Sequence, residues 1–225
     1  MLETSTGNEF RFVPEGPEVT QAEADAVLEA ATTIDCDYFV ASGSLPRGMA
    51  EDFYAQLGKR ATARGARFVL DTSGSALGKA LEAGGLFLIK PSRGEFETFA
   101  GRKLSPLELA EEANRLVDEG RAKNVAITLG REGAILATKS GAKIAPAVPV
   151  EACSAVGAGD SFLAGMVYGF SLGRTAEQAF DVGLAAGAAA VLSCGSELAR
   201  PEDLKRLVGQ ALSGEQVGDL GSGSR

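Results

Sequence analysis

The stretch Ser154–Phe162, which reads SAVGAGDSF, decides how this sequence is interpreted. Its three small residues at 157–159 allow a ligand to approach the backbone closely. An apolar pattern of helical period follows, and it predicts a helix over Gly159–Leu172. The first N–H groups of a helix have no partner within it and lie at the positive end of its dipole, so an anionic group can bind there. The stretch therefore predicts an anion site with a carboxylate, Asp160, beside it.

Two roles suit Asp160 at the start of that helix. A carboxylate beside a bound anion can accept the proton of a substrate hydroxyl, as the catalytic aspartate of kinases does. Alternatively, an aspartate in the first turn stabilises the N-terminus of its own helix. Capping alone would not require three small residues before it, so the flanking residues favour the catalytic role.

On both sides of this stretch, extended apolar segments alternate with amphipathic ones. This alternation is typical of βαβ units, in which helices cover a mainly parallel sheet. Strands are predicted at Glu9–Val13, Cys36–Ala41, Ala66–Asp71, Leu86–Lys90, Val125–Leu129, Ala134–Thr138 and Lys143–Val148. Helices are predicted at Gln21–Ala31, Glu51–Arg64, Ser75–Ala83, Pro106–Glu119, Gly159–Leu172, Ala176–Leu192 and Pro201–Leu212. The last two strands, separated by Ser140 and Gly141, are predicted to form a hairpin.

Two glycine-rich stretches resemble nucleotide-binding motifs but lack a required residue. Gly74–Ala80 follows a strand and opens a helix like a Walker A loop, yet it is one residue short between its glycines and has Ala80 in place of the Mg²⁺-binding hydroxyl. Gly157–Phe162 begins like a dinucleotide fingerprint, but Phe162 stands at the third glycine position. Neither a P-loop nor a dinucleotide site is therefore predicted.

The composition is that of a soluble globular chain and excludes several classes of protein. Its 225 residues are 45% hydrophobic and 23% charged, and no stretch is long and apolar enough to cross a bilayer. The 30 acidic and 22 basic residues give a net charge of −8, which disfavours a nucleic-acid binder held by phosphate contacts. The chain contains no histidine, which excludes every mechanism that needs one. Catalysis would rest on carboxylates, lysines, hydroxyls, backbone dipoles or a cofactor.

The three cysteines, Cys36, Cys153 and Cys194, are far apart in the sequence. Their odd number and wide spacing predict neither a disulfide framework nor a zinc site. We expect three small, buried thiol side chains in a reducing cytosol.

Four segments in the same order carry a family resemblance. They are Ala41–Gly48 (ASGSLPRG), Val69–Gly74 (VLDTSG), Leu88–Glu95 (LIKPSRGE) and Ser154–Phe162, accompanied by Thr128–Gly133 (TLGREG). Together they resemble the signatures of the ribokinase-like, phosphofructokinase B family of sugar kinases, over nearly the whole chain to about Leu212. The SGSLP, DTSG and KPS segments are most similar to the branch that acts on hexose phosphates. The resemblance implies a ribokinase-like three-layer αβα sandwich with a mainly parallel central sheet.

The resemblance implies roles for several residues at the reacting phosphoryl group. Asp160 would contact the sugar and deprotonate its accepting hydroxyl, while Gly157, Ala158 and Gly159 would form the anion hole. Such a hole together with Mg²⁺ suffices for phosphoryl transfer, which needs mainly positioning and charge neutralisation. Glu95 would orient Mg²⁺ through water, because Mg²⁺ keeps much of its hydration shell. A solvated loop glutamate is the alternative for Glu95.

The resemblance also implies residues for the nucleotide, the sugar phosphate and a monovalent cation. ATP would be bound by Lys90, Ser92, Thr128, Gly130, Gly133, Leu184, Gly187 and Ala188, and the sugar phosphate by Ser44, Asp71 and Asp160. K⁺ would bind backbone carbonyl groups near Ser154, Val156, Ala190, Ser193 and Gly195. Simpler alternatives are a strand-end lysine for Lys90, a turn for Gly130 and Gly133, and tight helix packing for the small residues at 183–188. Ser92 stands where the family often has asparagine, although a hydroxyl can also bind water or phosphate.

The resemblance begins only at the end of the family's small β lid. Residues 1–13 are expected to be a remnant of that lid, 14–213 a nucleotide-binding α/β domain, and 214–225 a disordered tail. The first part of the family's pattern, which carries a sugar-binding aspartate and most of the lid, is not found. Met1 is therefore expected to be a late start or a fragment boundary, with the nucleotide half of the pattern present and the sugar half incomplete.

These features predict the nucleotide-binding portion of an ATP-dependent sugar-phosphate kinase, with ATP and Mg²⁺ as cofactors and fructose 6-phosphate as the sugar phosphate. 1-Phosphofructokinase and tagatose-6-phosphate kinase are the alternatives within this class, and an inactive nucleotide-binding module is the alternative outside it. We expect a cytoplasmic protein that binds neither nucleic acid nor membrane. Exposed sheet edges predict a homodimer or a larger species.

Overall fold

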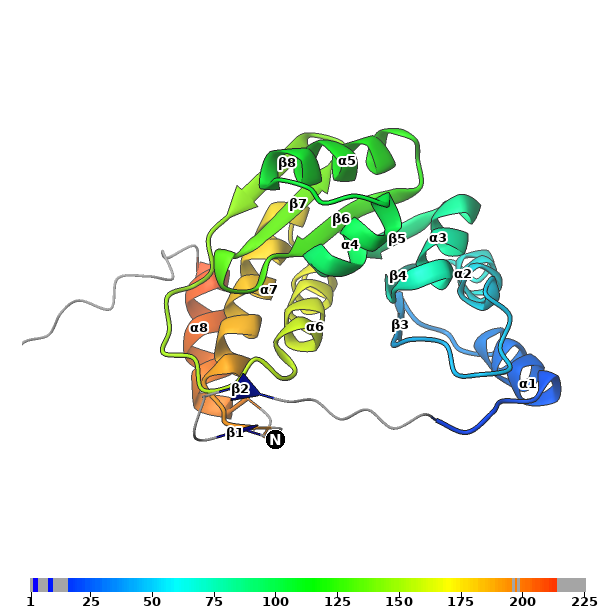
Figure 1. The fold of residues 1–225 in the computed structure, drawn as a ribbon, viewed down its shortest axis with the longest axis horizontal. Helices are drawn as coiled ribbons and strands as arrows, with labels where there is room; N and C mark the ends of the chain where they lie inside the picture. Colours follow the sequence, from blue (N-terminus) through cyan, green and yellow to red (C-terminus); the bar gives the residue numbers. More distant parts are fainter. Residues whose placement is uncertain (1, 4–7, 10–15, 196, 198, 214–225) are drawn as a thin grey trace, which may run out of the picture. The chain divides into compact units, whose positions relative to one another are not determined.

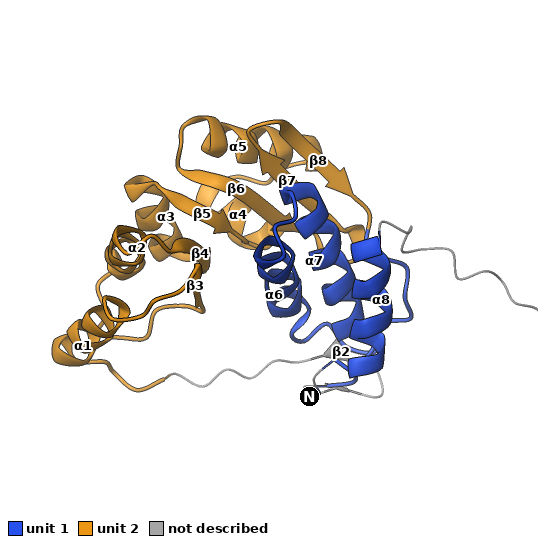
Figure 2. Cartoon of the chain, turned by 180° about the vertical axis from the view of Figure 1, so that it is seen from behind, with its two compact units in different colours: residues 1–15, 147–225 blue, residues 16–146 orange. Residues whose placement is uncertain are grey.

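The computed structural model describes residues 2–3, 8–9, 16–195, 197 and 199–213. The chain forms two compact units: unit 1 consists of residues 1–15 and 147–225, and unit 2 of residues 16–146 (Figure 2). The predicted lid remnant (1–13) and tail (214–225) lie almost wholly outside the described residues, so that division of the chain stays a prediction.

Unit 2 is built on a six-stranded sheet in the order β3-β4-β5-β6-β7-β8 (Figure 1). β3 (Tyr38–Ser42), β4 (Arg67–Asp71), β5 (Leu86–Ile89) and β6 (Ala122–Thr128) pair in parallel, and β7 (Ala134–Thr138) and β8 (Gly141–Ala145) continue the sheet in antiparallel pairing. The mainly parallel sheet and its hairpin are confirmed. β8 begins two residues earlier than predicted, because Thr138 pairs directly with Gly141 across the turn.

The helices of unit 2 alternate with its parallel strands along the chain, and the first of them precedes β3. They are α1 (Gln21–Ala31), α2 (Phe53–Ala63), α3 (Gly74–Ala83), α4 (Arg93–Ala100) and α5 (Pro106–Asp118), followed by the short 3₁₀ turn η1 (Gly130–Glu132). Apolar side chains of α1, α2, α3 and α5 pack in one core cluster with Phe68, Leu70 and Ile89 of the sheet. All four residues of β5 are buried, as is typical of a central parallel strand.

α4 occupies a segment for which no helix is predicted. Its N-terminus is a capping box, in which Ser92 Oγ accepts a hydrogen bond from Glu95 N at 3.4 Å and Glu95 Oε2 accepts one from Ser92 N at 2.7 Å. Gly101, in the left-handed conformation with φ +70°, ends the helix. The Ser-x-x-Glu pattern at 92–95 is the sequence signal for this helix, and Glu95 is a helix residue rather than a loop residue.

The described part of unit 1 contains the helices α6 (Ala158–Ser171), α7 (Ala176–Val191) and α8 (Pro201–Ser213), and the short strands β1 (Leu2–Glu3) and β2 (Asn8–Glu9). β1 and β2 pair with each other, and the rest of the strand predicted at 9–13 lies outside the described residues. Among the described residues, no helix is long and apolar enough to cross a membrane.

Small residues allow α6 and α7 to pack closely. A Cβ added at Gly165 would lie 2.7 Å from Ala186 Cβ, and one at Gly169 would lie 2.8 Å from Ala179 Cα. Both distances are shorter than real contacts, so glycine is required at these positions. α7 packs in turn against α8, and Leu207 of α8 is 2% exposed.

Cys153 and Cys194 of unit 1 form a disulfide, with their Cα atoms 5.0 Å apart. The prediction of three thiols is therefore wrong for this pair, whereas Cys36 is free and half-buried. The fold brings the segment before α6 beside the end of α7, where Cys153 N donates to Val191 O at 2.6 Å. The 41-residue separation of the two cysteines gives no sequence signal for this pairing.

Candidate active site

The predicted site residues of unit 2 lie at the carboxyl ends of its parallel strands. Ser44 follows β3, Asp71 ends β4, Lys90 and Ser92 follow β5, and Thr128 ends β6. The carboxyl ends of parallel strands share one edge of the sheet, which is where α/β proteins bind ligands. The structure thus brings these residues, separated by as much as 84 positions in the sequence, to one edge of unit 2.

Lys90 and Asp71 form a buried ion pair at this edge. Lys90 Nζ lies 3.1 Å from Asp71 Oδ2, and the two side chains are only 6% and 13% exposed. The family resemblance implies contact of Lys90 with the nucleotide phosphates and of Asp71 with the sugar phosphate. A buried charge requires a partner, so the two side chains act as one unit, and a phosphate bound by Lys90 would share the ammonium group with Asp71.

The loop after β3 is fastened to the end of β4. Gly43 N donates to Asp71 O at 2.9 Å, and Gly43 O accepts hydrogen bonds from Tyr54 Oη and Thr72 Oγ1 at 2.8 Å each. Burial, together with the nearby Asp71 carboxylate, raises the pKa of Tyr54 above its usual value. The exposed Ser44 is thereby held near Asp71. No sequence pattern marks Tyr54 or Thr72 for this supporting role.

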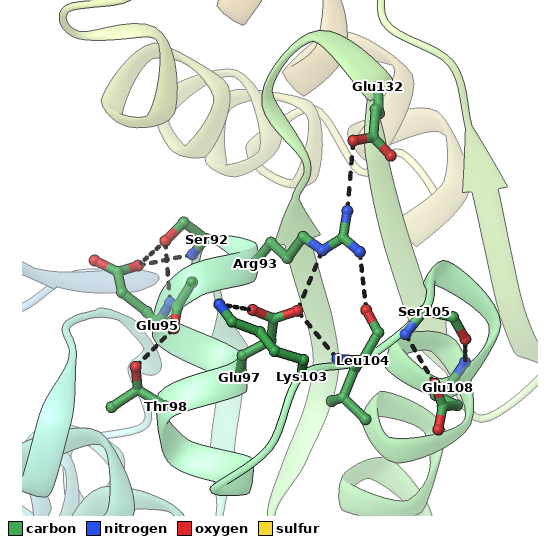
Figure 3. Close-up of polar contacts among 11 residues, drawn as sticks. Ser92, Arg93, Glu95, Glu97, Thr98, Lys103, Leu104, Ser105, Glu108 and Glu132 are labelled. Carbon is green, nitrogen blue, oxygen red and sulfur yellow. Dashed lines mark hydrogen bonds and ion pairs between the residues drawn. The ribbon is translucent and has the colours of Figure 1, made fainter.

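Ser92 and Glu95 bind each other at the N-terminus of α4 (Figure 3). Ser92 N and Oγ both donate to Glu95 Oε2, at 2.7 and 2.8 Å. Glu95 Oε1 accepts no hydrogen bond from another described residue, so one carboxylate oxygen remains for a hydrated cation. The described residues contain no cluster of three or more Asp, Glu, His or Cys side chains that could hold a metal. Mg²⁺ is often bound by one or two carboxylates with water and substrate phosphates, and Glu95 fits that kind of site.

The loop Thr128–Gly133 lies beside Ser92. Ser92 and Thr128 form a parallel bridge, and Thr128 N donates to Pro91 O at 3.1 Å. The loop closes through Leu129 N, which donates to Gly133 O at 2.8 Å. Gly130 and Gly133 have φ values of +62° and +109°, so this turn accounts for both glycines. Their contact with a nucleotide stays a prediction.

The N-terminus of α6, in unit 1, is open. Gly157 is the N-cap residue with φ +76°, and no side chain caps the helix. Ser161 N donates to Gly157 O at 2.9 Å, whereas Gly159 N and Asp160 N have no acceptor among the described residues. The Asp160 side chain is exposed and makes no capping hydrogen bond. α6 therefore begins with unbonded N–H groups and an available carboxylate.

The small residues of α7 are explained in part by helix packing. A Cβ at Gly183 would lie 2.7 Å from Met166 Cγ, and one at Gly187 would lie 3.3 Å from the carbonyl oxygen of Ala158. Leu184 is half-buried and Ala188 is buried. Gly187 thus packs against the first residue of α6, while adenine contacts by Leu184, Gly187 and Ala188 stay a prediction.

The residues predicted for K⁺ come from two segments of unit 1 that lie side by side. They are Ser154, Val156, Ala190, Ser193 and Gly195. Ser154 N donates to Val191 O at 3.3 Å, and Ser154 Oγ donates to Gly195 O at 3.1 Å. Carbonyl oxygens such as that of Gly195 carry two lone pairs, so they can accept a hydrogen bond and still bind a hard cation. The donor set fits K⁺, and the Cys153–Cys194 disulfide joins the same two segments.

The sequence is similar to a family of known proteins and to several characterised members of it. The family described as pfkB family carbohydrate kinase matches residues 2–203. The ATP-dependent 6-phosphofructokinase isozyme 2 of Mycobacterium tuberculosis is 36% identical over 220 residues, which are 96% of this chain and 64% of that protein. The 1-phosphofructokinase of Bacillus subtilis is 31% identical over 208 residues, which are 92% of this chain and 68% of that protein. The chain thus spans less than two thirds of the length of the Mycobacterium relative.

Solved structures agree with the fold. The structure of phosphofructokinase-2 from Escherichia coli in complex with potassium matches with a TM-score of 0.86 at 31% identity, covering 92% of this chain and 68% of that one. This similarity confirms the predicted ribokinase-like α/β fold with its mainly parallel sheet.

Proposed function

Because this chain belongs to the pfkB family of carbohydrate kinases, we propose that it is the nucleotide-binding part of an ATP-dependent sugar-phosphate kinase. Fructose 6-phosphate, converted to fructose 1,6-bisphosphate, is the substrate that we favour, since the Mycobacterium relative is named a 6-phosphofructokinase. Phosphorylation of fructose 1-phosphate is the second candidate, since the Bacillus relative is named 1-phosphofructokinase.

The observation that carries this proposal is the open N-terminus of α6. Gly159 N and Asp160 N point to no acceptor within the described chain, and unbonded helix N–H groups stabilise an anion without a cation. In the proposed reaction they stabilise the transferring phosphoryl group, whose charge resides on its peripheral oxygens. The Asp160 carboxylate, with no capping bond to hold it, accepts the proton of the attacking sugar hydroxyl.

Glu95 supports the proposal at the strand edge of unit 2. Its capping-box bonds to Ser92 fix the carboxylate, so that Oε1 has a defined position for a water of a hydrated Mg²⁺. Mg²⁺, when bound, supplies positive charge that neutralises the nucleotide phosphates. Glu95 orients that charge, and Ser92 orients Glu95.

The remaining roles follow from the family resemblance and from position. In unit 2, Lys90, Ser92, Thr128, Gly130 and Gly133 contact the nucleotide, and Ser44 and Asp71 contact the sugar phosphate. In unit 1, Leu184, Gly187 and Ala188 flank adenine, and the carbonyl groups near Ser154, Val156, Ala190, Ser193 and Gly195 bind K⁺. The potassium complex of the Escherichia coli enzyme supports the cation assignment.

A cytoplasmic location and a homodimer are part of the proposal. Both ATP and sugar phosphates are cytoplasmic metabolites. β3 lies at one edge of the described sheet, its residue Val40 is 45% exposed, and an exposed apolar edge favours association. Light scattering at several protein concentrations measures the mass of the species in solution.

Two assays on one preparation test the proposed function. Calorimetry measures MgATP binding, and a coupled assay measures phosphorylation of fructose 6-phosphate, fructose 1-phosphate and tagatose 6-phosphate. Binding with turnover of one sugar phosphate supports the kinase and identifies its substrate. Binding without turnover of any of them identifies a nucleotide-binding module. A folded chain that binds no MgATP contradicts both hypotheses, the kinase and the nucleotide-binding module.

A further inference from the structure

Arg93, the first residue of α4, has a guanidinium group that contacts three segments of unit 2 (Figure 3). Its Nε donates to Glu97 Oε1 at 3.3 Å, and its Nη2 donates to Leu104 O at 2.9 Å. Its Nη1 lies 3.4 Å from Glu132 Oε1, on the turn η1. One side chain therefore connects α4, the α4–α5 connection and the loop at 128–133.

The guanidinium group is held in place independently of Glu132. Glu97 is 7% exposed and also accepts hydrogen bonds from Lys103 Nζ at 2.7 Å and from Leu104 N at 3.1 Å. An ordinary surface ion pair gains little, because two long side chains must both be ordered. Arg93 is already ordered by Glu97 and Leu104, so only Glu132 has to be fixed when the pair forms.

The turn that carries Glu132 is closed on itself by its backbone, since Leu129 N donates to Gly133 O at 2.8 Å and Thr128 pairs with Ala134 of β7. Among residues 130–133 of the described chain, Glu132 makes the one side-chain ion pair to another segment. Gly130 and Gly133 have no side chains, and Arg131 has no polar partner among the described residues. At its other end the loop is fastened by Thr128 N, which donates to Pro91 O at 3.1 Å. The loop is thus tied to the segment 91–93 twice, by a backbone hydrogen bond at its start and by the Glu132 ion pair near its end.

We propose that Arg93 and Glu132 are positioning residues, whose ion pair sets the loop at 128–133 in register with the Ser92–Glu95 end of α4. The inference rests on the proposed function, which assigns the nucleotide to the loop and Mg²⁺ to Glu95. MgATP has to meet the loop and, through its metal, Glu95 at the same time, whereas ATP without the metal has no cation for Glu95 to orient. Loss of the pair therefore weakens binding of MgATP more than binding of free ATP.

The Arg93–Glu132 pair contributes little to the stability of the fold. An effect of its loss on ligand binding can therefore be measured in a chain that is still folded. The Glu132 side chain is 61% exposed, and an exposed ion pair adds little to the free energy of unfolding. A substitution at Glu132 leaves the buried contacts of Arg93 with Glu97 and Leu104 in place. Substitution of Arg93 would instead disturb the surroundings of the buried Glu97 carboxylate, so Glu132 is the position to change.

Calorimetry on the whole chain measures the dissociation constants of ATP and of MgATP for the wild type, Glu132→Ala and Glu132→Gln. The dissociation constant of ATP divided by that of MgATP measures how much the metal adds to binding. This ratio therefore reports how well Glu95 and the loop are aligned. We expect Glu132→Ala to lower this ratio about three- to fivefold, with an unchanged melting temperature. Glu132→Gln lowers it less, because an amide oxygen still accepts a hydrogen bond from Arg93.

Glu119→Ala is the matched control. Glu119 also pairs with arginines on the surface of unit 2, Arg115 and Arg121, but it precedes β6 and so lies at the opposite edge of the sheet. We expect the wild-type ratio in this variant. If Glu132→Ala fails to fold, Glu132→Gln carries the test alone.

The outcomes separate this inference from the proposed function. A wild-type ratio in both Glu132 variants, in a chain that binds MgATP, overturns the positioning role and leaves the proposed function standing. An equal loss of affinity for ATP and MgATP also overturns it, because only the loop would then have been loosened. A folded wild type that binds no MgATP overturns the proposed function and this inference with it.

Discussion

Two carboxylates lie in the first turns of helices, Asp160 in α6 and Glu95 in α4, and they differ in their hydrogen bonds. Glu95 Oε2 accepts two hydrogen bonds from Ser92, whereas Asp160 caps nothing although it also lies in the first turn. An acidic residue in the first turn gains from the helix dipole in both cases. The absence of a capping bond at Asp160 leaves that carboxylate available for a substrate proton, and this difference carries the assignment of the base.

Asp160→Asn should abolish phosphoryl transfer while leaving MgATP affinity within a few-fold of wild type. The amide keeps the shape of the side chain but cannot take the hydroxyl proton, and loss of a general base costs about 10²–10⁴ in rate. A coupled assay on an active preparation measures the rate, and calorimetry measures the affinity. Glu177→Gln, a carboxylate in the first turn of α7, is the matched control. Wild-type turnover of Asp160→Asn would remove Asp160 from the role of base.

Glu95→Gln should raise the Mg²⁺ concentration needed for half-maximal MgATP binding. Glutamine keeps the capping box, so the helix N-terminus is preserved while the charge is lost. Glu108→Gln is the matched control, because Glu108 occupies the same capping-box position in α5, where its carboxylate accepts a hydrogen bond from Ser105 N at 2.8 Å. An unchanged Mg²⁺ titration of Glu95→Gln would show that Glu95 is a helix cap and nothing more.

At the scale of elements, the connection from α4 to α5 is held by Glu97. The Lys103 ammonium group above all, then Leu104 N and Arg93, lower the pKa of the Glu97 carboxyl from 4.5 to about 2. A carboxyl group whose pKa is lower in the folded state stabilises the fold at pH values above its unfolded pKa. That contribution is lost as the pH falls from about 4.5 to about 2.

Glu97→Gln should therefore make the free energy of unfolding of unit 2 depend less on pH in the acid range. The wild type is expected to lose stability between pH 4.5 and about 2, and the variant to lose less over the same interval. Urea unfolding at a series of pH values measures the free energy of unfolding. Glu111→Gln, at a carboxyl group on α5 that makes no ion pair or hydrogen bond with another described residue, should follow the wild type. Parallel profiles for wild type and Glu97→Gln would contradict this account.

The disulfide links the segment before α6 to the segment after α7. It closes a chain segment of 41 residues, and the chain-entropy treatment gives about 4 kcal/mol for a closure of that length. Reduction of the disulfide should accordingly lower the urea concentration at the unfolding midpoint of unit 1. The double variant Cys153→Ser/Cys194→Ser should be insensitive to the reducing agent, and Cys36→Ser should respond like the wild type. An equal midpoint with and without reducing agent would show that the bond does not stabilise unit 1.

Elements with a periodic pattern could be predicted from the sequence, and those that depend on tertiary contacts could not. α1 has the predicted bounds, and α5 begins at Pro106 as predicted. The eight-residue helix α4 is too short to show a clear apolar period, so the pattern does not predict it. Its capping-box residues are nevertheless visible in the sequence. The Lys90–Asp71 and Arg93–Glu132 pairs join residues from different strands and loops, so only the fold reveals them.

At the scale of the whole molecule, the family could be predicted because its motifs are distributed along both units. The net charge of −8 gives no hint of a polyanionic ligand, and it shows that binding of ATP would depend on local groups rather than on the overall field. In the proposed function these local groups are the open N-terminus of α6, the Lys90 ammonium group and a metal ion that Glu95 would orient. Two proposals, one for each unit, are therefore that the start of α6 binds phosphate and that the loop at 128–133 binds the nucleotide.

Hydrogen–deuterium exchange with and without MgATP tests both proposals in one experiment, because the backbone amide groups proposed to bind the ligand are themselves the probes. We expect slower exchange on addition of MgATP in peptides covering 128–133 and 157–161, with no change over the hairpin of β7 and β8. Unchanged exchange at both segments, in a folded chain at saturating MgATP, would show that neither segment binds the nucleotide.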